Sequence, residues 1–242
     1  MKFTLNINNN LKEIINTLEK AGFEAYLVGG CVRDLLMGRG PKDWDVATNA
    51  TPDQVQKLFP ESVYENEFGT VAVKTGIEIG IVEITTYRKE GKYTDKRHPD
   101  EIKFAKNIEE DLARRDFTIN SIALKFPIIV DPFNGQQDIK NKVIRTVGNA
   151  EDRFSEDALR LMRAVRLAAE LDFGIEKKTS DAIAKMAGLL EMIAKERICD
   201  EFIKLIMADK AGDGIRMMAE SGLLRYVLPE LIEGVGVGQN KH

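Results

Sequence analysis

Near the start of the chain, segments with hydrophobic residues at helical spacing alternate with segments typical of β-strands. Apolar residues in the segment 9–22 recur at helical intervals, which predicts an opening helix that Gly22 terminates. Short β-rich segments follow, namely AYLVGG (25–30), DWDVAT (43–48), TVAVKT (70–75) and IEIGIVEITTYR (77–88). Helical stretches lie between them, and one opens at Thr51 and Pro52, because Thr caps a helix and Pro suits its first turn. This alternation predicts a mixed sheet with helices packed on it.

The pattern changes near residue 148. From about Asn149 to Tyr226 the Val- and Ile-rich strands disappear, and Leu, Ala, Met, Arg and Glu recur three and four residues apart. We therefore predict an α+β protein with two parts. A mixed-sheet head occupies residues 1–148, and an all-helical region occupies residues 149–242.

Composition excludes several classes of protein. The chain has 242 residues, of which 43% are hydrophobic, so it can bury a sizeable core. No run approaches the roughly 18 apolar residues that a membrane span needs. Cys31 and Cys199 are far apart and lack CxxC spacing, so neither a disulfide framework nor a zinc site is expected, and a cytoplasmic location is the default. The net charge of −4 means that any nucleic acid must bind to a locally positive surface.

The segment Asp43-Trp44-Asp45 is the first candidate for chemistry. Alternate side chains of a strand point the same way, so the two carboxylates would share a face about 7 Å apart. Such a pair is an arrangement that Mg²⁺ uses, because it prefers oxygen ligands. The alternative is two solvated aspartates at a strand edge. A third carboxylate nearby would favour the metal site, and Glu83 is the first candidate because it interrupts an apolar run. Asp131 is the second candidate.

The segment VGGCVRD (28–34) is the second candidate. A hydrophobic strand ends in Gly29 and Gly30, and a helix is expected to begin at once. Glycines let a ligand approach the backbone, and the amides at a helix start attract phosphate oxygens. Arg33 could then form a charge-assisted hydrogen bond to the phosphate. The alternative is a tight turn with a buried pair of Arg33 and Asp34.

Taken together, these motifs resemble a known family. GG-x-VRD followed by the aspartates of LMGRGPKDWDVAT is similar to the signature of the DNA polymerase β-like nucleotidyltransferases, and within them to the bacterial class II tRNA CCA-adding enzyme and poly(A) polymerase family. RRDFTIN (114–120), EDALRLMRAVR (156–166) and ERICDEFIKLI (196–206) resemble further motifs of that family, in the same order. The resemblance implies a polymerase β-like head, a helical neck and the start of a body domain.

The resemblance also implies roles for residues of the head. Asp43 and Asp45 would bind two Mg²⁺ ions for phosphoryl transfer, with Glu83 as the third catalytic carboxylate. The remaining matched positions of the head would bind the nucleotide: Gly29, Gly30, Arg33, Asp34, Arg115, Asp116 and Asn120. We expect Asp116 and Asn120 to lie one helical turn apart, so that both face the sugar of one nucleotide.

The segment EDALRLMRAVR is expected to select the base. On one continuous helix, Glu156, Arg160 and Arg163 would share a face, with Asp157 beside them. Cytosine and adenine both present an amino donor next to a ring nitrogen that accepts, whereas uracil and guanine present the reverse. A carboxylate and an arginine therefore admit C and A, and Asp157 with Arg160 is the expected pair, oriented by Glu156. The alternative is an ordinary Glu–Arg pair on a helix surface.

The predicted activity is the transfer of CMP and AMP from CTP and ATP to the 3′ end of tRNA, with release of pyrophosphate. The polar segment 88–101 matches a loop that the family associates with addition of the terminal A, and its length argues against an enzyme restricted to CC. A poly(A) polymerase or A-adding enzyme is the nearest rival, and CTP incorporation separates the two. A non-catalytic RNA-binding module is the remote rival, which NTP turnover would exclude.

Overall fold

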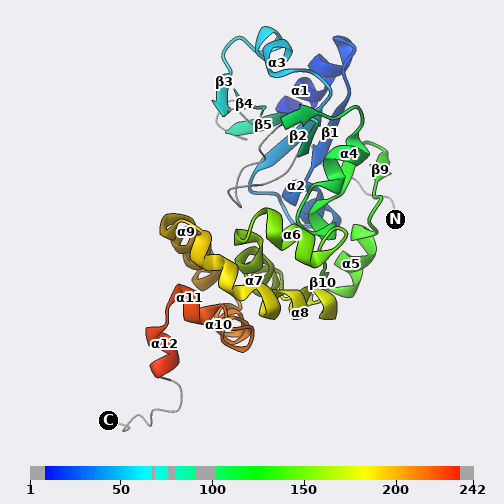
Figure 1. Cartoon of the computed structure of the whole chain (residues 1–242). Helices are drawn as coiled ribbons and strands as arrows, with labels where there is room; N and C mark the ends of the chain where they lie inside the picture. The colour runs from blue at the N-terminus through cyan, green and yellow to red at the C-terminus, as the bar shows by residue number, and fades with distance from the viewer. Residues whose placement is uncertain (1–8, 67–68, 76–79, 91–101, 235–242) are drawn as a thin grey trace. The chain divides into compact units, whose positions relative to one another are not determined.

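The computed structural model describes residues 9–66, 69–75, 80–90 and 102–234, which divide into two compact units (Figure 1). Among these residues, the first unit extends to residue 90 and continues over 102–140, and the second begins at Asn141. The second compact unit thus starts ahead of residue 149, where the change of hydrophobic pattern puts the domain boundary. No helix in the described ranges has the length and apolar character required to cross a membrane.

The first unit is built on one mixed sheet of seven strands, in the order β3-β4-β5-β2-β1-β8-β9. The strands are β1 (Ala25–Val28), β2 (Trp44–Thr48), β3 (Val63–Asn66), β4 (Thr70–Lys74), β5 (Ile81–Thr86), β8 (Ala123–Lys125) and β9 (Ile128–Val130). The central neighbours β2 and β5 run parallel, while the other neighbouring strands of this sheet pair antiparallel. This confirms the predicted α+β head with a mixed sheet. A separate pair joins β6 (Arg88–Glu90) to β7 (Ile102–Phe104).

Helices pack on both faces of this sheet. The first face carries Leu27, Val46 and Ile84, which share a core with α1 (Asn9–Lys20), α2 (Gly30–Leu36) and α3 (Pro52–Leu58). The opposite face carries Val28, Ala47 and Ala123, which pack with residues of α4 (Ile108–Ala113). Because strand residues alternate between faces, Asp45 lies on the same face as Ala47. The α4 face is therefore the one that carries the candidate carboxylate.

Local signals account for the ends of these helices. Gly22 adopts a φ of +88° just after α1, as expected for the residue that terminates a helix. At the start of α3, the Thr51 amide donates to Oε1 of Gln54 at 2.9 Å, and Pro52 occupies the first helical position.

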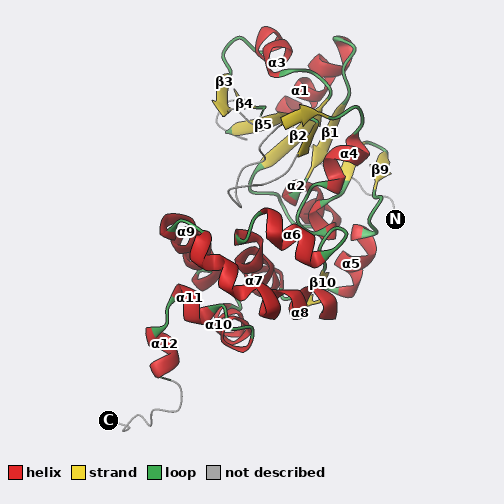
Figure 2. Ribbon diagram, viewed as in Figure 1, coloured by secondary structure: helices red, strands yellow, loops and turns green. Residues whose placement is uncertain are grey.

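The second unit is mainly helical, as Figure 2 shows. Its helices are α6 (Ala150–Glu156), α7 (Leu159–Leu171), α8 (Lys177–Met186), η2 (Ala187–Met192), α9 (Lys195–Ile206), α10 (Ala211–Glu220), α11 (Leu224–Val227) and α12 (Glu230–Glu233). Helix α5 (Gly135–Asn141) ends where this unit begins. A two-residue parallel pair, β10 (Val143–Ile144) with β11 (Gly174–Ile175), brings a short strand into the region predicted to be entirely helical.

Helix α7 is the centre of the second unit. Most of its residues are buried, and it packs against α9 and α10. Gly214 permits the close approach of α10, because a Cβ there would lie 3.1 Å from Cβ of Ala169 and 3.2 Å from Leu205. Packing against α9 and α10 thus supports α7, at whose start the base-selecting residues were predicted.

Candidate active site

Asp45 is the second residue of β2, and Asp43 immediately precedes that strand. Asp45 is half-buried, whereas Asp43 is exposed. Burial raises the pKa of the Asp45 carboxyl above its usual value; nearby Arg115 opposes this shift and Asp43 adds to it. Two carboxylates that destabilise each other's charge at one strand start form a site that a cation would stabilise.

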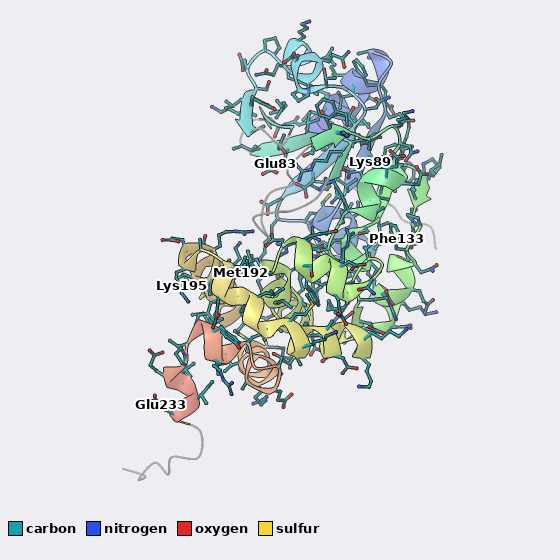
Figure 3. All side chains as sticks on the ribbon, viewed as in Figure 1. Glu83, Lys89, Phe133, Met192, Lys195 and Glu233 are labelled. Carbon is teal, nitrogen blue, oxygen red and sulfur yellow. The ribbon has the colours of Figure 1, made fainter. Side chains whose placement is uncertain are left out.

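Glu83 lies directly opposite Asp45, because β2 and β5 pair in parallel with these two residues in register. Residues in register on neighbouring strands point to the same face, so both carboxylates extend from the α4 face of the sheet. Glu83 is exposed, and Figure 3 shows it on the sheet of the first unit. The register therefore favours Glu83 as the third carboxylate.

Asp131, the other candidate, has a different environment. It follows β9, which β8 and β1 separate from β2. Its oxygens accept the amides of Gly135 at 2.7 Å and Gln136 at 2.9 Å, so it caps the first turn of α5. These contacts give Asp131 a structural role at the edge of the sheet.

Asp43, Asp45 and Glu83 lie on or beside two neighbouring strands of the sheet. Within the ranges that the structure describes, no three or more His, Cys, Asp or Glu side chains are gathered closely enough to hold a metal ion. Mg²⁺ sites in nucleotide-binding enzymes commonly use one or two carboxylates, with waters and substrate phosphates as the other ligands. Asp43 and Asp45 fit that pattern, since they come from one strand start and interact electrostatically.

The glycine turn before α2 lies beside this pair. Gly29 has a φ of +76°, and a Cβ there would lie 3.1 Å from Nη1 of Arg115 and 3.2 Å from Oδ2 of Asp45. An arginine and a carboxylate thus meet at the buried Gly29 turn. A glycine is required at this position both for its left-handed backbone and for the space.

Arg33 is buried and forms the pair with Asp34 that the alternative interpretation predicts. Its Nε donates to Oδ1 of Asp34 at 2.9 Å, and Nη1 donates to Oδ1 of Asn120 at 2.9 Å. The Asn120 amide in turn donates to Oδ1 of Asp116 at 3.4 Å. The glycine-turn segment and the RRDFTIN segment therefore share one chain of side-chain hydrogen bonds.

The predicted helix through RRDFTIN is wrong. Helix α4 ends at Ala113, and only Thr118–Asn120 form a short 3-10 helix (η1). Asp116 lies in the turn between them, where its own Oδ1 accepts the amide of Phe117 at 2.8 Å and competes with helical hydrogen bonding. Asp116 and Asn120 nevertheless meet, through this turn instead of a helical repeat.

Asp111 was missed by the sequence analysis. It is 1% exposed and accepts hydrogen bonds from both Arg114 and Arg115. Its spacing from the two arginines, three and four residues, is the signal that could have identified it.

In the second unit, the predicted continuous helix over residues 156–166 is also wrong. Helix α6 ends at Glu156, Asp157 is extended with φ −138°, and α7 begins at Leu159. The break arises because Oδ1 of Asp157 accepts the Leu159 amide at 3.0 Å, as a capping residue does.

The break changes the pairing of the predicted base-selecting residues. Arg160 contacts Oε2 of Glu156 through Nη1 at 2.5 Å, which agrees with an arginine oriented by that glutamate. Asp157 instead pairs with Arg197 of α9, whose Nη2 lies 2.8 Å from Oδ2. Arg163 lies on α7 and, with Arg166, acts on the pKa of Glu201.

Glu201 and Arg197 both belong to ERICDEFIKLI, one of the segments that resemble motifs of the family. Glu201 is 3% exposed and accepts a hydrogen bond from Nε of Arg166 at 2.6 Å. Arg197 thus holds Asp157 just before α7, and Glu201 holds Arg166 in the middle of α7. Their partners could not be read from the sequence, because each pair spans more than 30 residues.

Comparisons with known proteins agree with this description. The model of the poly(A) polymerase head domain matches residues 25–145, and a model described as the probable RNA and SrmB-binding site of polymerase A matches residues 172–234. A CCA-adding enzyme of Lactococcus lactis subsp. lactis is 47% identical over 91% of this chain and 56% of its own length.

Solved structures are similar as well. The Bacillus stearothermophilus CCA-adding enzyme in complex with CTP has a TM-score of 0.83 and 41% identity, over 91% of this chain and 54% of its own. A tRNA nucleotidyltransferase complexed with a primer tRNA and an incoming ATP analog has a TM-score of 0.76 and 26% identity, over 94% and 64%. The chain spans about half the length of the curated relatives it matches. It belongs to the poly(A) polymerase head-domain family.

Proposed function

We propose that this chain carries the catalytic part of an RNA nucleotidyltransferase that adds CMP and AMP to the 3′ end of tRNA. The reaction joins the RNA 3′ oxygen to the α-phosphate of CTP or ATP and releases pyrophosphate. The observation that carries the proposal is the register of Asp45 and Glu83 beside the Gly29 turn, with Arg115 at the same point. Charge and a glycine turn are thereby available where a triphosphate would need them.

Asp43 and Asp45 would hold two Mg²⁺ ions, and Glu83, in register with Asp45, would be the third catalytic carboxylate. When bound, these ions would supply charge neutralisation for the triphosphate and a lower pKa for the RNA 3′ hydroxyl. The raised pKa of Asp45 supports this assignment, because a carboxylate that is costly to ionise by itself has the most to gain from a cation. Divalent metal use is general among nucleotidyltransferases. We propose further that the metal is Mg²⁺ and that two ions bind.

Gly29, Gly30 and Arg115 would receive the triphosphate. At the Gly29 turn, Nη1 of Arg115 lies 3.1 Å from the position that a Cβ would take, so a phosphate bound there would meet this guanidinium. Arg33 is held by Asp34 and Asn120, so it would contribute positive charge from a fixed position. Asp116 and Asn120, at the end of the same hydrogen-bond chain, would face the sugar.

The second unit would select the base. Arg160, oriented by Glu156, would donate to the ring nitrogen that C and A leave unprotonated. Asp157, which has an extended backbone between α6 and α7 and pairs with Arg197, would accept from the exocyclic amino group. Arg163 would add positive charge to this group.

The similarity to CCA-adding enzymes supports tRNA as the substrate over poly(A) synthesis. Residues 91–101, which include most of the segment linked to addition of the terminal A, lie outside the described residues.

Equilibrium binding of the four nucleoside triphosphates in the presence of Mg²⁺ tests the proposal. CTP and ATP should bind more tightly than UTP and GTP, and removal of Mg²⁺ should weaken binding of both. Asp45→Ala is the matched variant, since it removes a carboxylate without touching the predicted base-selecting residues. Equal affinity for all four nucleotides, or binding that is indifferent to Mg²⁺ and to Asp45, would refute it.

A further inference from the structure

Asp111 has a different partner set on each of its two oxygens. Oδ1 accepts from Nε of Arg114 at 3.0 Å, from Nη2 of Arg114 at 2.8 Å and from the Arg88 amide at 3.3 Å. Oδ2 accepts from Nε of Arg115 at 3.3 Å and from Nη2 at 3.1 Å. One oxygen thus ties α4 to the start of β6, and the other is given to Arg115.

Asp111 is charged although it is buried. Burial by itself raises the pKa of this carboxyl, but Arg115 and Arg114 bring the pKa below its usual value. Because a buried carboxylate is costly without a partner, Asp111 favours keeping its contacts with both arginines. This fixes one side of the Arg115 guanidinium.

The other side of that guanidinium meets the candidate site. With Nε and Nη2 bound to Asp111, Nη1 lies 3.1 Å from the point that a Gly29 Cβ would occupy, and Oδ2 of Asp45 lies 3.2 Å from the same point. A side-on contact to a carboxylate uses two nitrogens in a fixed plane, so it also fixes the direction of the third. The orientation of Nη1 therefore depends on Asp111.

We propose that Asp111 is a positioning residue that holds the Arg115 guanidinium against the Gly29 turn, ready for a triphosphate. This rests on the proposed nucleotidyltransferase function. Asp111 contacts Arg115 and not the nucleotide, so it acts through that arginine. Arg114 pairs with the same carboxylate but binds Oδ1, whereas Arg115 binds Oδ2.

A double-mutant cycle on CTP binding in Mg²⁺ tests the proposal with the full chain. Asp111→Asn and Arg115→Gln should each weaken CTP binding about tenfold, as expected for one charge-assisted hydrogen bond. Asp111→Asn should have less than about a twofold further effect when Arg115→Gln is already present. Equal effects of Asp111→Asn in both backgrounds would overturn the proposal, since Asp111 would then act on the fold independently of Arg115.

Arg114→Gln is the matched control, and it should change CTP affinity by no more than about twofold. If Arg114→Gln reduced CTP affinity as much as Arg115→Gln does, this would contradict the proposal that only the Oδ2 contact of Asp111 serves nucleotide binding. Failure of the unaltered chain to bind CTP would count against the proposed function itself.

A second measurement needs neither nucleotide nor a folded Asp111 variant. Hydrogen exchange of the arginine Nε–H groups can be followed by NMR in the unaltered chain, with Arg115→Lys to assign the signal. The Arg115 Nε–H should exchange at least about tenfold more slowly than that of exposed Arg39. Equal exchange rates would overturn the positioning role, whatever the outcome with CTP.

Discussion

Glu83 lies in register with Asp45 across the parallel strands β2 and β5, so the two carboxylates extend from one face of the sheet. That face is covered by α4 around Ala47, and the turn after α4 brings Arg115 to Asp45 and Gly29. The sheet register and the end of one helix thus assemble acidic and basic groups at a glycine turn. The predictions for Asp45 and Gly29 depend on this arrangement.

Replacing Asp45 by Asn should not destabilise the protein at neutral pH. The folded-state pKa of Asp45 is raised above its usual value of 3.8, so ionisation is harder in the folded chain than in the unfolded one. Protonated Asp45 therefore stabilises the folded state, and this stabilisation is lost as the pH rises through the folded-state pKa. The Asn side chain of the variant does not ionise, so its stability does not fall in this way. In urea unfolding at several pH values, the free energy of unfolding of the variant should increase relative to that of the unaltered protein as the pH rises from 4 to 7.

Added Mg²⁺ provides the complementary control. It should raise the melting temperature of the unaltered protein by binding the folded state, and it should have no effect on Asp45→Asn. A variant that is less stable than the unaltered protein at pH 7 by more than about 1 kcal/mol would mean that Asp45 is a structural residue.

Gly29→Ala should damage nucleotide binding as well as stability. The left-handed backbone costs a non-glycine residue about 1–2 kcal/mol, and the new Cβ would push against Arg115 and Asp45. Gly38→Ala is the matched control, because Gly38 has a φ of +71° and nothing within 4 Å of its Cβ position. Both variants should lose similar stability in thermal unfolding, but only Gly29→Ala should weaken CTP binding. Equal CTP affinity in the two variants would show that the space beside Gly29 is not used.

Glu201→Ala should strongly destabilise the second unit. The carboxylate is 3% exposed and pairs with Arg166 at 2.6 Å, and removing one partner of a buried pair costs about 3–5 kcal/mol. Glu151→Ala is the control, because its pair with Lys185 is exposed and is expected to contribute about 0.2–1 kcal/mol. Denaturant unfolding of both variants compares these values.

Glu201 should also make the protein sensitive to acid. Burial tends to raise the pKa of this carboxyl, but Arg166 and Arg163 bring it below its usual value of 4.5. The stability it provides is therefore present above pH 4.5 and lost as the pH falls through the lowered folded-state pKa. A Glu201→Gln variant that unfolds with the same acid dependence as the unaltered protein would exclude this source.

Changing Asp157 or Arg160 should relax the choice of base. Arg160→Ala leaves Glu156 without its 2.5 Å partner, and Asp157→Asn weakens both the pair with Arg197 and the acceptor offered to an amino group. Each lost hydrogen bond in a selecting site is expected to reduce discrimination by about 1–3 kcal/mol. The affinities of CTP and UTP should therefore approach each other. Arg153→Ala is a useful control, since Arg153 also contacts Glu156, at 2.7 Å, but was not assigned to the base.

The sequence predicted the mixed sheet because this depends on alternation and local glycines. Asp43 and Asp45 were paired from strand periodicity and Glu83 was added because it interrupts an apolar run, and the structure puts Asp45 and Glu83 in register. The two continuous helices failed because Asp116 and Asp157 each accept a nearby backbone amide and interrupt helical hydrogen bonding. The spacing of hydrophobic residues does not reveal this competition for backbone amides.

The remaining omissions concern pairs that are distant in sequence. Asp157 with Arg197 and Arg166 with Glu201 are joined only when α7 packs against α9. A spacing rule detects partners three or four residues apart, such as Asp111 and Arg115, but not partners on different helices. Tertiary packing decided these contacts.

Incorporation of labelled nucleotides tests the central claim most directly. The 242-residue chain would be given Mg²⁺ and a tRNA that ends at its discriminator base, with CTP and ATP separately and together, and Asp45→Ala as the inactive control. The account predicts two C residues followed by one A when both nucleotides are present, and no addition by the variant. Incorporation of A alone, or equal incorporation by Asp45→Ala, would contradict it.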